Sequence, residues 1–359
     1  MRIVFDLDDT ISIHTNRDFA NASPIQETIK KIRALKKDGC EITIYSARGQ
    51  SSCKGDLALI EERNRRQVET WLKKYDVPYD QLLFGKPLGD LYVDDKGVSL
   101  EDFLVGKYGK LKGNSGSEIY RAGNRVIKKC KDAAMQAEWY AQAKVFGIKT
   151  PAVYSVVLDT ISMEYINGET GAERTLHTGD IYGIASLAIL MSLKKDGYTF
   201  DTDALKRRAE EHLQSCGRGG LFQKLFSFLE ANKDKYGAEA SFCHGDLSLS
   251  NIIYAGGDIY LIDPITNDRY SSYLLDLAKL RFSLNGGEDF LHPERAQHDK
   301  RTDYPTLLSE YSQMLDENGF EEKVIALEAI YWIRLLKYTA EAERRDIAIR
   351  KAQELEESL

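Results

Sequence analysis

Over the first hundred residues, short apolar runs alternate with stretches of helical periodicity. The apolar runs are IVF (3–5), EITIY (41–45), QLLF (81–84) and LYV (91–93). Between them, apolar residues recur at helical spacing along SPIQETIKKIRALKK and again over about 56–75. Ser23 and Gln26 predict a capping box at the start of the first helix. Alternating strands and helices are typical of an α/β, doubly wound parallel sheet.

The pattern changes near residues 105–113, which are rich in Gly and Lys. We therefore expect a first domain over 1–105 and a second over 106–359. The second begins with short strands and becomes mostly helical from about Gly179. Its last stretch, 321–359, predicts one or two amphipathic helices.

Composition narrows the class of protein. Of 359 residues, 43% are hydrophobic and 29% are charged, which is ordinary for a globular chain. The net charge of −7 argues against a nucleic-acid partner, because binding to phosphate backbones needs a basic face. Five cysteines without a CxxC pair predict neither a disulfide framework nor a zinc site. With no signal peptide and no membrane helix in the pattern, we expect a cytoplasmic protein of undetermined oligomeric state.

Polar groups suited to phosphoryl chemistry follow the predicted strands of the first domain. They are Asp6 and Asp8, Ser46, Lys86, and Asp94 and Asp95. In parallel sheets the carboxyl ends of strands form the ligand site. One carboxylate can attack phosphorus, and another can transfer protons to and from the reacting oxygens. Mg²⁺ prefers such oxygen ligands, while a hydroxyl and an ammonium can hold phosphate oxygens.

The ordered motifs FDLDDT, YSAR, FGKP and YVDD resemble those of the haloacid dehalogenase-like (HAD) hydrolases. The resemblance implies Asp6 as nucleophile, Asp8 as general acid/base and Ser46 and Lys86 as phosphate binders. It also implies a Mg²⁺ site at Asp6, Asp8, Asp94 and Asp95. Asp9 is expected to be a turn or capping residue. The short segments between motifs leave no room for a cap domain over the site.

A second constellation lies in CHGDLSLSNIIY and the following LID. Its H-x-D-x-x-x-x-N spacing is that of a kinase catalytic loop. Asp246 would accept the proton of an attacking hydroxyl, and Asn251 and Asp263 would hold Mg²⁺ on ATP.

Upstream residues complete a predicted ATP site. The segment GNSGSEIY predicts a loop whose backbone covers phosphates, with Gly113, Ser115, Gly116 and Ser117 as binding residues. Strand alternation favours Lys128 over Lys129 as the phosphate-binding lysine, and Glu138 is expected to anchor it. Glu164 and Ile166, in MEYI, are expected at a hinge that binds adenine.

This set resembles the aminoglycoside phosphotransferase and choline kinase-like families over about 108–359. The resemblance implies an α+β, bilobal, protein-kinase-like domain with an N-lobe of about 106–166 and a C-lobe of about 167–359. Its substrates would be ATP and a small molecule rather than a protein. Asp276 fits a structural aspartate of these families or, equally, a helix-capping acid.

A phosphatase and a kinase acting on one phosphate group would only hydrolyse ATP. We therefore predict a bifunctional enzyme that acts on two positions or two compounds, such as sugar, polyol or amino alcohol phosphates. Resemblance to capsular polysaccharide biosynthesis proteins suggests bacterial surface-glycan precursor synthesis. The alternatives are an antibiotic- or choline-type kinase with an accessory phosphatase, a nucleic-acid end-processing enzyme, or a regulatory binding module. The acidic balance and the absence of a GxxxxGK[ST] loop count against the nucleic-acid alternative.

Overall fold

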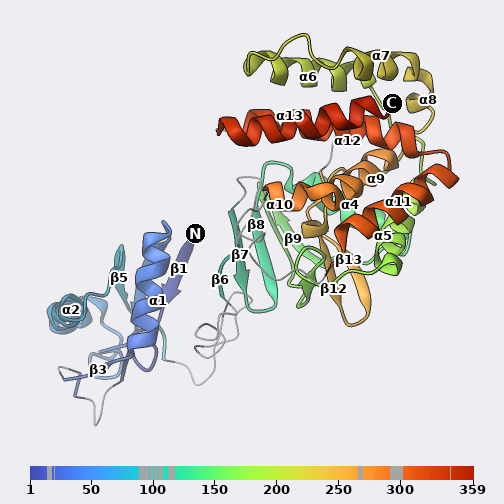
Figure 1. The fold of residues 1–359 in the computed structure, drawn as a ribbon. Helices are drawn as coiled ribbons and strands as arrows, with labels where there is room; N and C mark the ends of the chain where they lie inside the picture. Colours follow the sequence, from blue (N-terminus) through green and yellow to red (C-terminus); the bar gives the residue numbers. More distant parts are fainter. Residues whose placement is uncertain are drawn as a thin grey trace. The chain divides into compact units, whose positions relative to one another are not determined.

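The computed structural model divides into two compact units, Met1–Ile127 and Lys128–Leu359 (Figure 1). It describes residues 1–13, 18–19, 21–88, 97, 100, 103, 108–111, 118–265, 270–291, 302–339 and 341–359. The expected boundary after residue 105 lies outside the described residues, and the division between the units falls within a later strand.

The first unit contains a parallel sheet of three described strands, β1 (Arg2–Phe5), β4 (Glu41–Ser46) and β5 (Gln81–Phe84). Its order is β1-β4-β5, so β4 lies in the middle. Val4 aligns with Thr43, and Tyr45 aligns with Leu83. The prediction of parallel strands is confirmed for these three, while the predicted strand at 91–93 lies outside the described residues.

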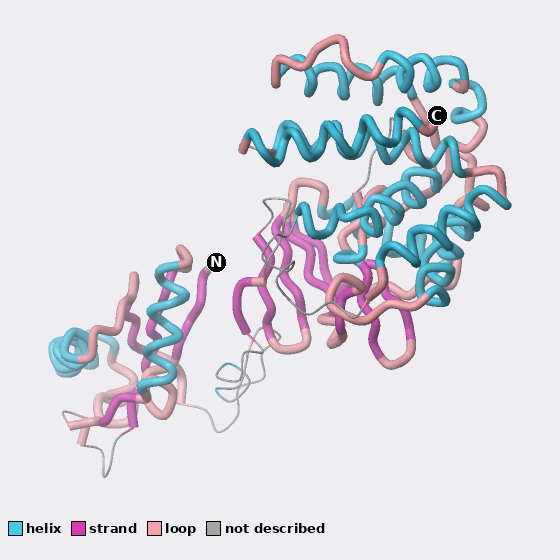
Figure 2. Tube along the Cα trace, in the orientation of Figure 1, coloured by secondary structure: helices cyan, strands magenta, loops and turns pink. Residues whose placement is uncertain are grey.

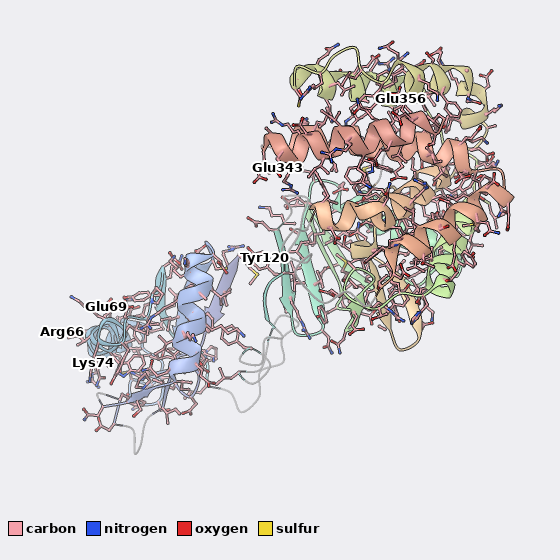
Figure 3. The ribbon with its side chains drawn as sticks, viewed as in Figure 1. Arg66, Glu69, Lys74, Tyr120, Glu343 and Glu356 are labelled. Carbon is pink, nitrogen blue, oxygen red and sulfur yellow. The ribbon has the colours of Figure 1, made fainter. Side chains whose placement is uncertain are left out.

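Two helices connect these strands, as Figure 2 shows. They are α1 (Gln26–Lys37) and α2 (Leu57–Lys74). The core is formed by apolar side chains of both helices and of the sheet, including Ile29, Ile32, Ile42, Ile44, Ile60 and Leu72. Arg66, Glu69 and Lys74 lie on the exposed side of α2 (Figure 3). The spacing of apolar residues in the sequence therefore correctly predicted which faces of α1 and α2 are buried.

The predicted capping box at Ser23 is wrong. Ser23 and Pro24 form the short strand β3, which pairs with β2 (Ser12–Ile13). Because the backbone is extended there, α1 begins only at Gln26, and its N-cap residue Ile25 makes no side-chain cap. The second helix has the expected kind of cap, since the Asp56 carboxylate accepts from the Leu59 amide at 3.2 Å.

A five-stranded sheet has the order β6-β7-β8-β10-β9. Its strands are Tyr108–Lys110, Glu118–Ala122, Arg125–Lys129, Thr160–Glu164 and Val153–Val157 in that order. The helix α4 (Ala133–Val145) follows β8 in the chain. A smaller sheet orders β11 (Glu169–Thr170), β12 (Ile252–Ala255) and β13 (Asp258–Leu261).

The rest of the second unit is helical. Its elements are α5 (Thr178–Met191), α6 (Thr202–Ser215), α7 (Gln223–Ala231), α8 (Lys233–Gly237), η1 (Leu249–Asn251), α9 (Tyr273–Phe282), η2 (Ser283–Gly287), α10 (Glu288–Leu291), α11 (Tyr304–Glu317), α12 (Glu321–Leu335), η3 (Leu336–Tyr338) and α13 (Ala342–Glu357). Two helices, α12 and α13, form the C-terminal stretch as predicted. No helix in the described part of the chain is long and apolar enough to cross a bilayer.

The helix α12 is not amphipathic, which corrects the expectation for this stretch. Every residue from Val324 to Ile333 is buried, because α12 packs against α9 on one side and α13 on another. Glu356 of α13 accepts from the Leu225 amide at the start of α7, at 2.9 Å (Figure 3). The buried part of α12 includes a charged residue, Glu328, near its middle.

Candidate functional site

The predicted phosphatase residues that the structure describes meet at one edge of the parallel sheet. Asp6 follows β1, Ser46 ends β4 and Lys86 lies just beyond β5. The Lys86 ammonium lies 3.1 Å from the Asp6 carboxylate. Asp94 and Asp95 lie outside the described residues. The arrangement brings a potential nucleophile and a cation together at the carboxyl ends of parallel strands.

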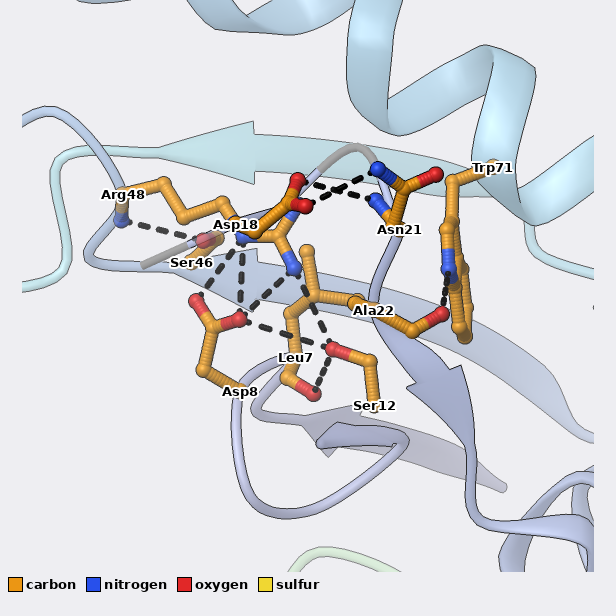
Figure 4. Close-up of polar contacts among 9 residues, drawn as sticks. All are labelled: Leu7, Asp8, Ser12, Asp18, Asn21, Ala22, Ser46, Arg48 and Trp71. Atoms are coloured by element: carbon orange, nitrogen blue, oxygen red, sulfur yellow. Dashed lines mark hydrogen bonds and ion pairs between the residues drawn. The ribbon is translucent and has the colours of Figure 1, made fainter. Parts of the chain in front are cut away.

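Arg48 completes this site, and sequence reasoning gave it no role. Its guanidinium binds the Asp8 carboxylate through Nε at 3.0 Å and Nη2 at 2.7 Å (Figure 4). Its amide also donates to Ser46 Oγ at 3.1 Å. Both Ser46 and Arg48 are buried. The arginine of the YSAR motif was visible in the sequence, but its pairing with Asp8 depends on β1 and β4 being neighbours.

Asp9 has the turn role that the sequence predicted. It is exposed, adopts φ +59° and donates its amide to the Ser12 carbonyl at 2.7 Å. Ser12 Oγ donates to the Leu7 carbonyl at 3.2 Å and lies 3.4 Å from Asp8 Oδ1 (Figure 4). The turn therefore supports the loop that carries Asp8.

The second candidate site is built on the loop from His244 to Asn251. His244 is fully buried, and its Nε2 lies 2.9 Å from the Ile262 carbonyl. Asp276 accepts the His244 amide at 2.7 Å and the Gly245 amide at 2.8 Å. Ser272, not Asp276, caps α9, so the structural reading of Asp276 is confirmed and the capping reading is wrong.

Gly245 meets a requirement that no other residue type satisfies here. Its φ is +80°, in the left-handed region, and an added Cβ would lie 2.6 Å from the Ile265 carbonyl oxygen. A side chain would therefore clash with backbone. The glycine therefore allows a tight turn of the backbone between His244 and Asp246.

The Asp246 carboxylate is held from both sides. Asn251 Nδ2 donates to its Oδ2 at 3.1 Å, and the Lys279 ammonium lies 3.0 Å from its Oδ1. Burial alone would raise the pKa of Asp246, but the charge and hydrogen bond of Lys279 outweigh it and lower the pKa. Lys279 was not predicted, because it lies 33 residues after Asp246 in an apolar helix.

Lys128 is the buried lysine of its pair, as predicted. Its ammonium contacts the Asp263 carboxylate and donates a hydrogen bond to Gln136 Oε1 at 3.0 Å. The Lys129 side chain is exposed, and its ammonium lies 3.9 Å from the Asp159 carboxylate. Asp263 adopts φ +57°, which an aspartate tolerates better than most residues. Lys128 and Asp263 thus join the β8 strand to the segment after β13.

The prediction that Glu138 anchors Lys128 is wrong. Glu138 is exposed on α4, whereas Gln136 is buried on the face that meets Lys128. Two positions along a helix differ by about 200° around its axis, so the two side chains point in nearly opposite directions.

The other predicted ATP-binding residues are only partly described. Gly113, Ser115, Gly116 and Ser117 lie outside the described residues. At the predicted hinge, the Glu164 carboxylate accepts the Ala152 amide at 3.1 Å, and Ile166 is buried. Their contact with adenine stays a prediction.

The donor set of the second unit fits Mg²⁺. Asn251 uses its amide nitrogen toward Asp246, which leaves Oδ1 for a cation, and Asp263 contacts Lys128 through Oδ1 only, which leaves Oδ2. Mg²⁺ commonly takes one or two protein oxygens together with substrate phosphates and water. Among the described residues, no group of three or more His, Cys, Asp or Glu side chains forms an all-protein metal cage.

No protein-family model and no curated protein matches the chain. Among solved structures, it is similar to a protein from Vibrio cholerae at 31% identity, over 29% of this chain and 86% of that chain, with a TM-score of 0.28. It is similar to a choline/ethanolamine kinase family protein from Mesorhizobium loti at 14% identity, over 70% and 90% of the two chains, with a TM-score of 0.42. A glucosamine kinase solved with glucosamine, ADP and inorganic phosphate is similar at 15% identity, over 71% and 82%, with a TM-score of 0.42.

The predicted small-molecule kinase activity stays a prediction. The phosphatase activity and the role in capsule synthesis stay predictions.

Proposed function

We propose that the second unit is an ATP-dependent phosphotransferase that acts on a hydroxyl of a small molecule. The observation that carries this proposal is the pair of clusters on one unit, Asp246 with Asn251 and Lys128 with Asp263. The first supplies a base for a hydroxyl, and the second supplies groups for the phosphates of ATP. Only residues 264–272 separate Asp263 from α9, which is too short for a phosphorylated activation loop like that of protein kinases.

The transfer is a direct displacement. The acceptor hydroxyl gives its proton to Asp246 as its oxygen bonds the γ-phosphorus. The bond from that phosphorus to the β-phosphate oxygen breaks, and ADP leaves. Lys128 holds the α- and β-phosphates once it exchanges Asp263 for them. Mg²⁺, held by Asn251 and Asp263, would neutralise phosphate charge when bound.

The test compares Asp246→Asn with the wild type and with Asp234→Asn, a change of the same chemistry at an exposed position of α8. Each protein is incubated with Mg·ATP and a panel of sugars, polyols and amino alcohols, and ADP release is measured. We expect Asp246→Asn to lose a factor of about 10²–10⁴ in kcat, because it loses the base. Asp234→Asn should match the wild type. Full activity in Asp246→Asn would refute the proposal.

A second candidate function is phosphomonoester hydrolysis by the first unit. The contact between Lys86 and Asp6 favours this second function. An ammonium beside a carboxylate can bind the oxygens of the phosphate group that the carboxylate attacks. The Asp6 oxygen would displace the alcohol from phosphorus, and water would then release phosphate from the aspartyl phosphate. The carboxylates of Asp6 and Asp8 supply oxygens of the kind that Mg²⁺ prefers.

Hydrolysis of p-nitrophenyl phosphate with Mg²⁺ tests this second function. Asp6→Asn should abolish release of phosphate, whereas the neighbouring Asp9→Asn should keep it, since Asp9 serves only a turn. Equal activity in both variants would exclude Asp6 as the nucleophile.

We further propose that the two activities act on different positions of a small phosphorylated compound. If both acted on one position, the enzyme would only hydrolyse ATP. A sugar or polyol phosphate for surface-glycan or capsule synthesis is the substrate class suggested by the motifs of the first domain.

A further inference from the structure

Lys279 places a positive charge inside a buried helix. All ten residues of α9 are buried, and Lys279 is 9% exposed. Its ammonium lies 4.7 Å from the ring centre of Phe282 and 5.1 Å from that of Tyr331. Such a charge is costly to bury unless it is paired. In the described part of the chain, the carboxylate that pairs with it is Asp246.

The nearby carboxylates of the second unit have other partners. Asp263 contacts Lys128, and Asp276 accepts two backbone amides of the catalytic loop. Glu328 contacts Arg281. Lys279 is therefore aimed at the base of the proposed reaction and not at a structural acid.

A second cation lies near the same tyrosine ring and acts on Asp246. The Arg334 guanidinium of α12 lies 5.6 Å from the ring centre of Tyr331, the same ring that Lys279 contacts. Its charge also helps to lower the pKa of Asp246. Asp246 alone would attract an ammonium, but Lys279 already neutralises it and Arg334 adds a further positive charge.

An acceptor must approach this pair closely. Its reacting hydroxyl has to hydrogen-bond Asp246 at about 3 Å to give up its proton. A substituent on the neighbouring carbon then lies within roughly 7 Å of the Lys279 ammonium, a distance at which charges still interact strongly in a partly buried site.

We propose that Lys279 selects the acceptor by charge: a neutral or phosphorylated alcohol is used, and an amino alcohol with its ammonium beside the reacting hydroxyl is rejected. This inference rests on the proposed kinase function of the second unit. It narrows the substrate to neutral and anionic sugars or polyols. Lys279 also acts as a positioning residue, because it holds one oxygen of Asp246 while Asn251 holds the other.

The experiment uses the full chain as wild type, Lys279→Gln and Lys279→Arg. Acceptors are two matched sets, glucose with glucosamine and glucose 1-phosphate, and glycerol with serinol and glycerol 3-phosphate. ADP release gives kcat and KM, and ³¹P NMR identifies products. We expect the wild type to prefer the neutral and phosphorylated members over the amine by at least about tenfold in kcat/KM. Lys279→Gln should reduce that preference by about tenfold, and Lys279→Arg should restore it.

The outcomes separate the inference from the function it rests on. A wild type that prefers glucosamine or serinol is a kinase without the proposed selection, and this result needs no variant to fold. An unchanged preference in Lys279→Gln, with ADP binding intact, shows that Lys279 does not set it. If the wild type transfers phosphate to no acceptor and hydrolyses no ATP, the kinase proposal fails and the inference falls with it.

Discussion

Among the residues of the second unit that the structure describes, three lysine and arginine side chains are buried, and each faces an opposite charge. Lys128 contacts Asp263, Lys279 lies 3.0 Å from Asp246, and Arg281 contacts Glu328. Removing one partner of a buried pair leaves an uncompensated charge, which costs about 3–5 kcal/mol. Single substitutions at the site therefore carry a stability cost as well as a catalytic one, and each test needs a measure of folding.

Asp276 makes the stability of the second unit depend on pH. Burial raises the pKa of its carboxyl to about 7, from an ordinary value of 3.8. The protonated form is favoured by folding, so this contribution is full below about pH 4 and is lost as the pH rises through about 7. Asp276→Asn stays neutral and lacks this dependence.

We therefore expect Asp276→Asn to lower the free energy of unfolding at both pH values. The loss should be larger at pH 5 than at pH 8 by about 1–3 kcal/mol. Urea unfolding at the two pH values measures it. A loss that is constant or grows with pH would contradict a raised pKa.

Gly245→Ala should destabilise the catalytic loop. Gly257→Ala is the matched control, because Gly257 also has positive φ, +87°, but nothing lies within 4 Å of an added Cβ. We expect Gly257→Ala to cost about 1 kcal/mol from backbone strain alone. Gly245→Ala should cost at least about 2 kcal/mol, since the clash with the Ile265 carbonyl is added. Equal losses in thermal unfolding would show that the loop moves aside.

At the scale of elements, the burial of α4 decides which residue anchors Lys128. Ala133, Gln136, Tyr140 and Ala143 lie on its buried face. Tyr140 accepts the Asp263 amide through its hydroxyl at 3.1 Å. One helix face therefore orients both members of the Lys128–Asp263 pair.

Gln136→Ala should raise the KM for ATP by about three- to tenfold, because it removes one hydrogen bond that orients a charged group. Glu138→Ala, two residues away on the exposed face, should leave the KM unchanged. The two variants are compared at saturating acceptor. A larger effect from Glu138→Ala would restore the original prediction.

At the scale of the whole molecule, each unit contains its own candidate site and its own core. The residues of each site that the structure describes all belong to one unit. We therefore expect Asp6→Asn to lose phosphatase activity while it keeps at least about half of the kinase activity, and Asp246→Asn to do the reverse.

The same two variants test the movement of phosphate between positions. With Mg·ATP and a sugar phosphate, Asp6→Asn should accumulate a bisphosphate that the wild type converts to a monophosphate with phosphate at a new position, seen by ³¹P NMR. Loss of activity on unrelated compounds would show that the two sites serve separate reactions.

Local sequence patterns determined much of the secondary structure of this protein and several residues of its candidate sites. Apolar spacing predicted the buried faces of α1 and α2, and short apolar runs predicted the parallel strands β1, β4 and β5. Motif spacing predicted the Asp246 and Asn251 pair, and strand alternation predicted the choice of Lys128 over Lys129. Each depends on residues close in the chain or on strand and helix periods, which a sequence contains directly.

Only the tertiary structure decided the partners of those residues. Arg48 meets Asp8 because β1 and β4 are neighbours, and Lys279 meets Asp246 because α9 packs against the catalytic loop. The strand at Ser23 displaced a predicted helix cap, since its pairing partner lies ten residues earlier in the chain, at Ile13. Such contacts join segments that are distant in the chain, and no local preference encodes the packing that brings them together.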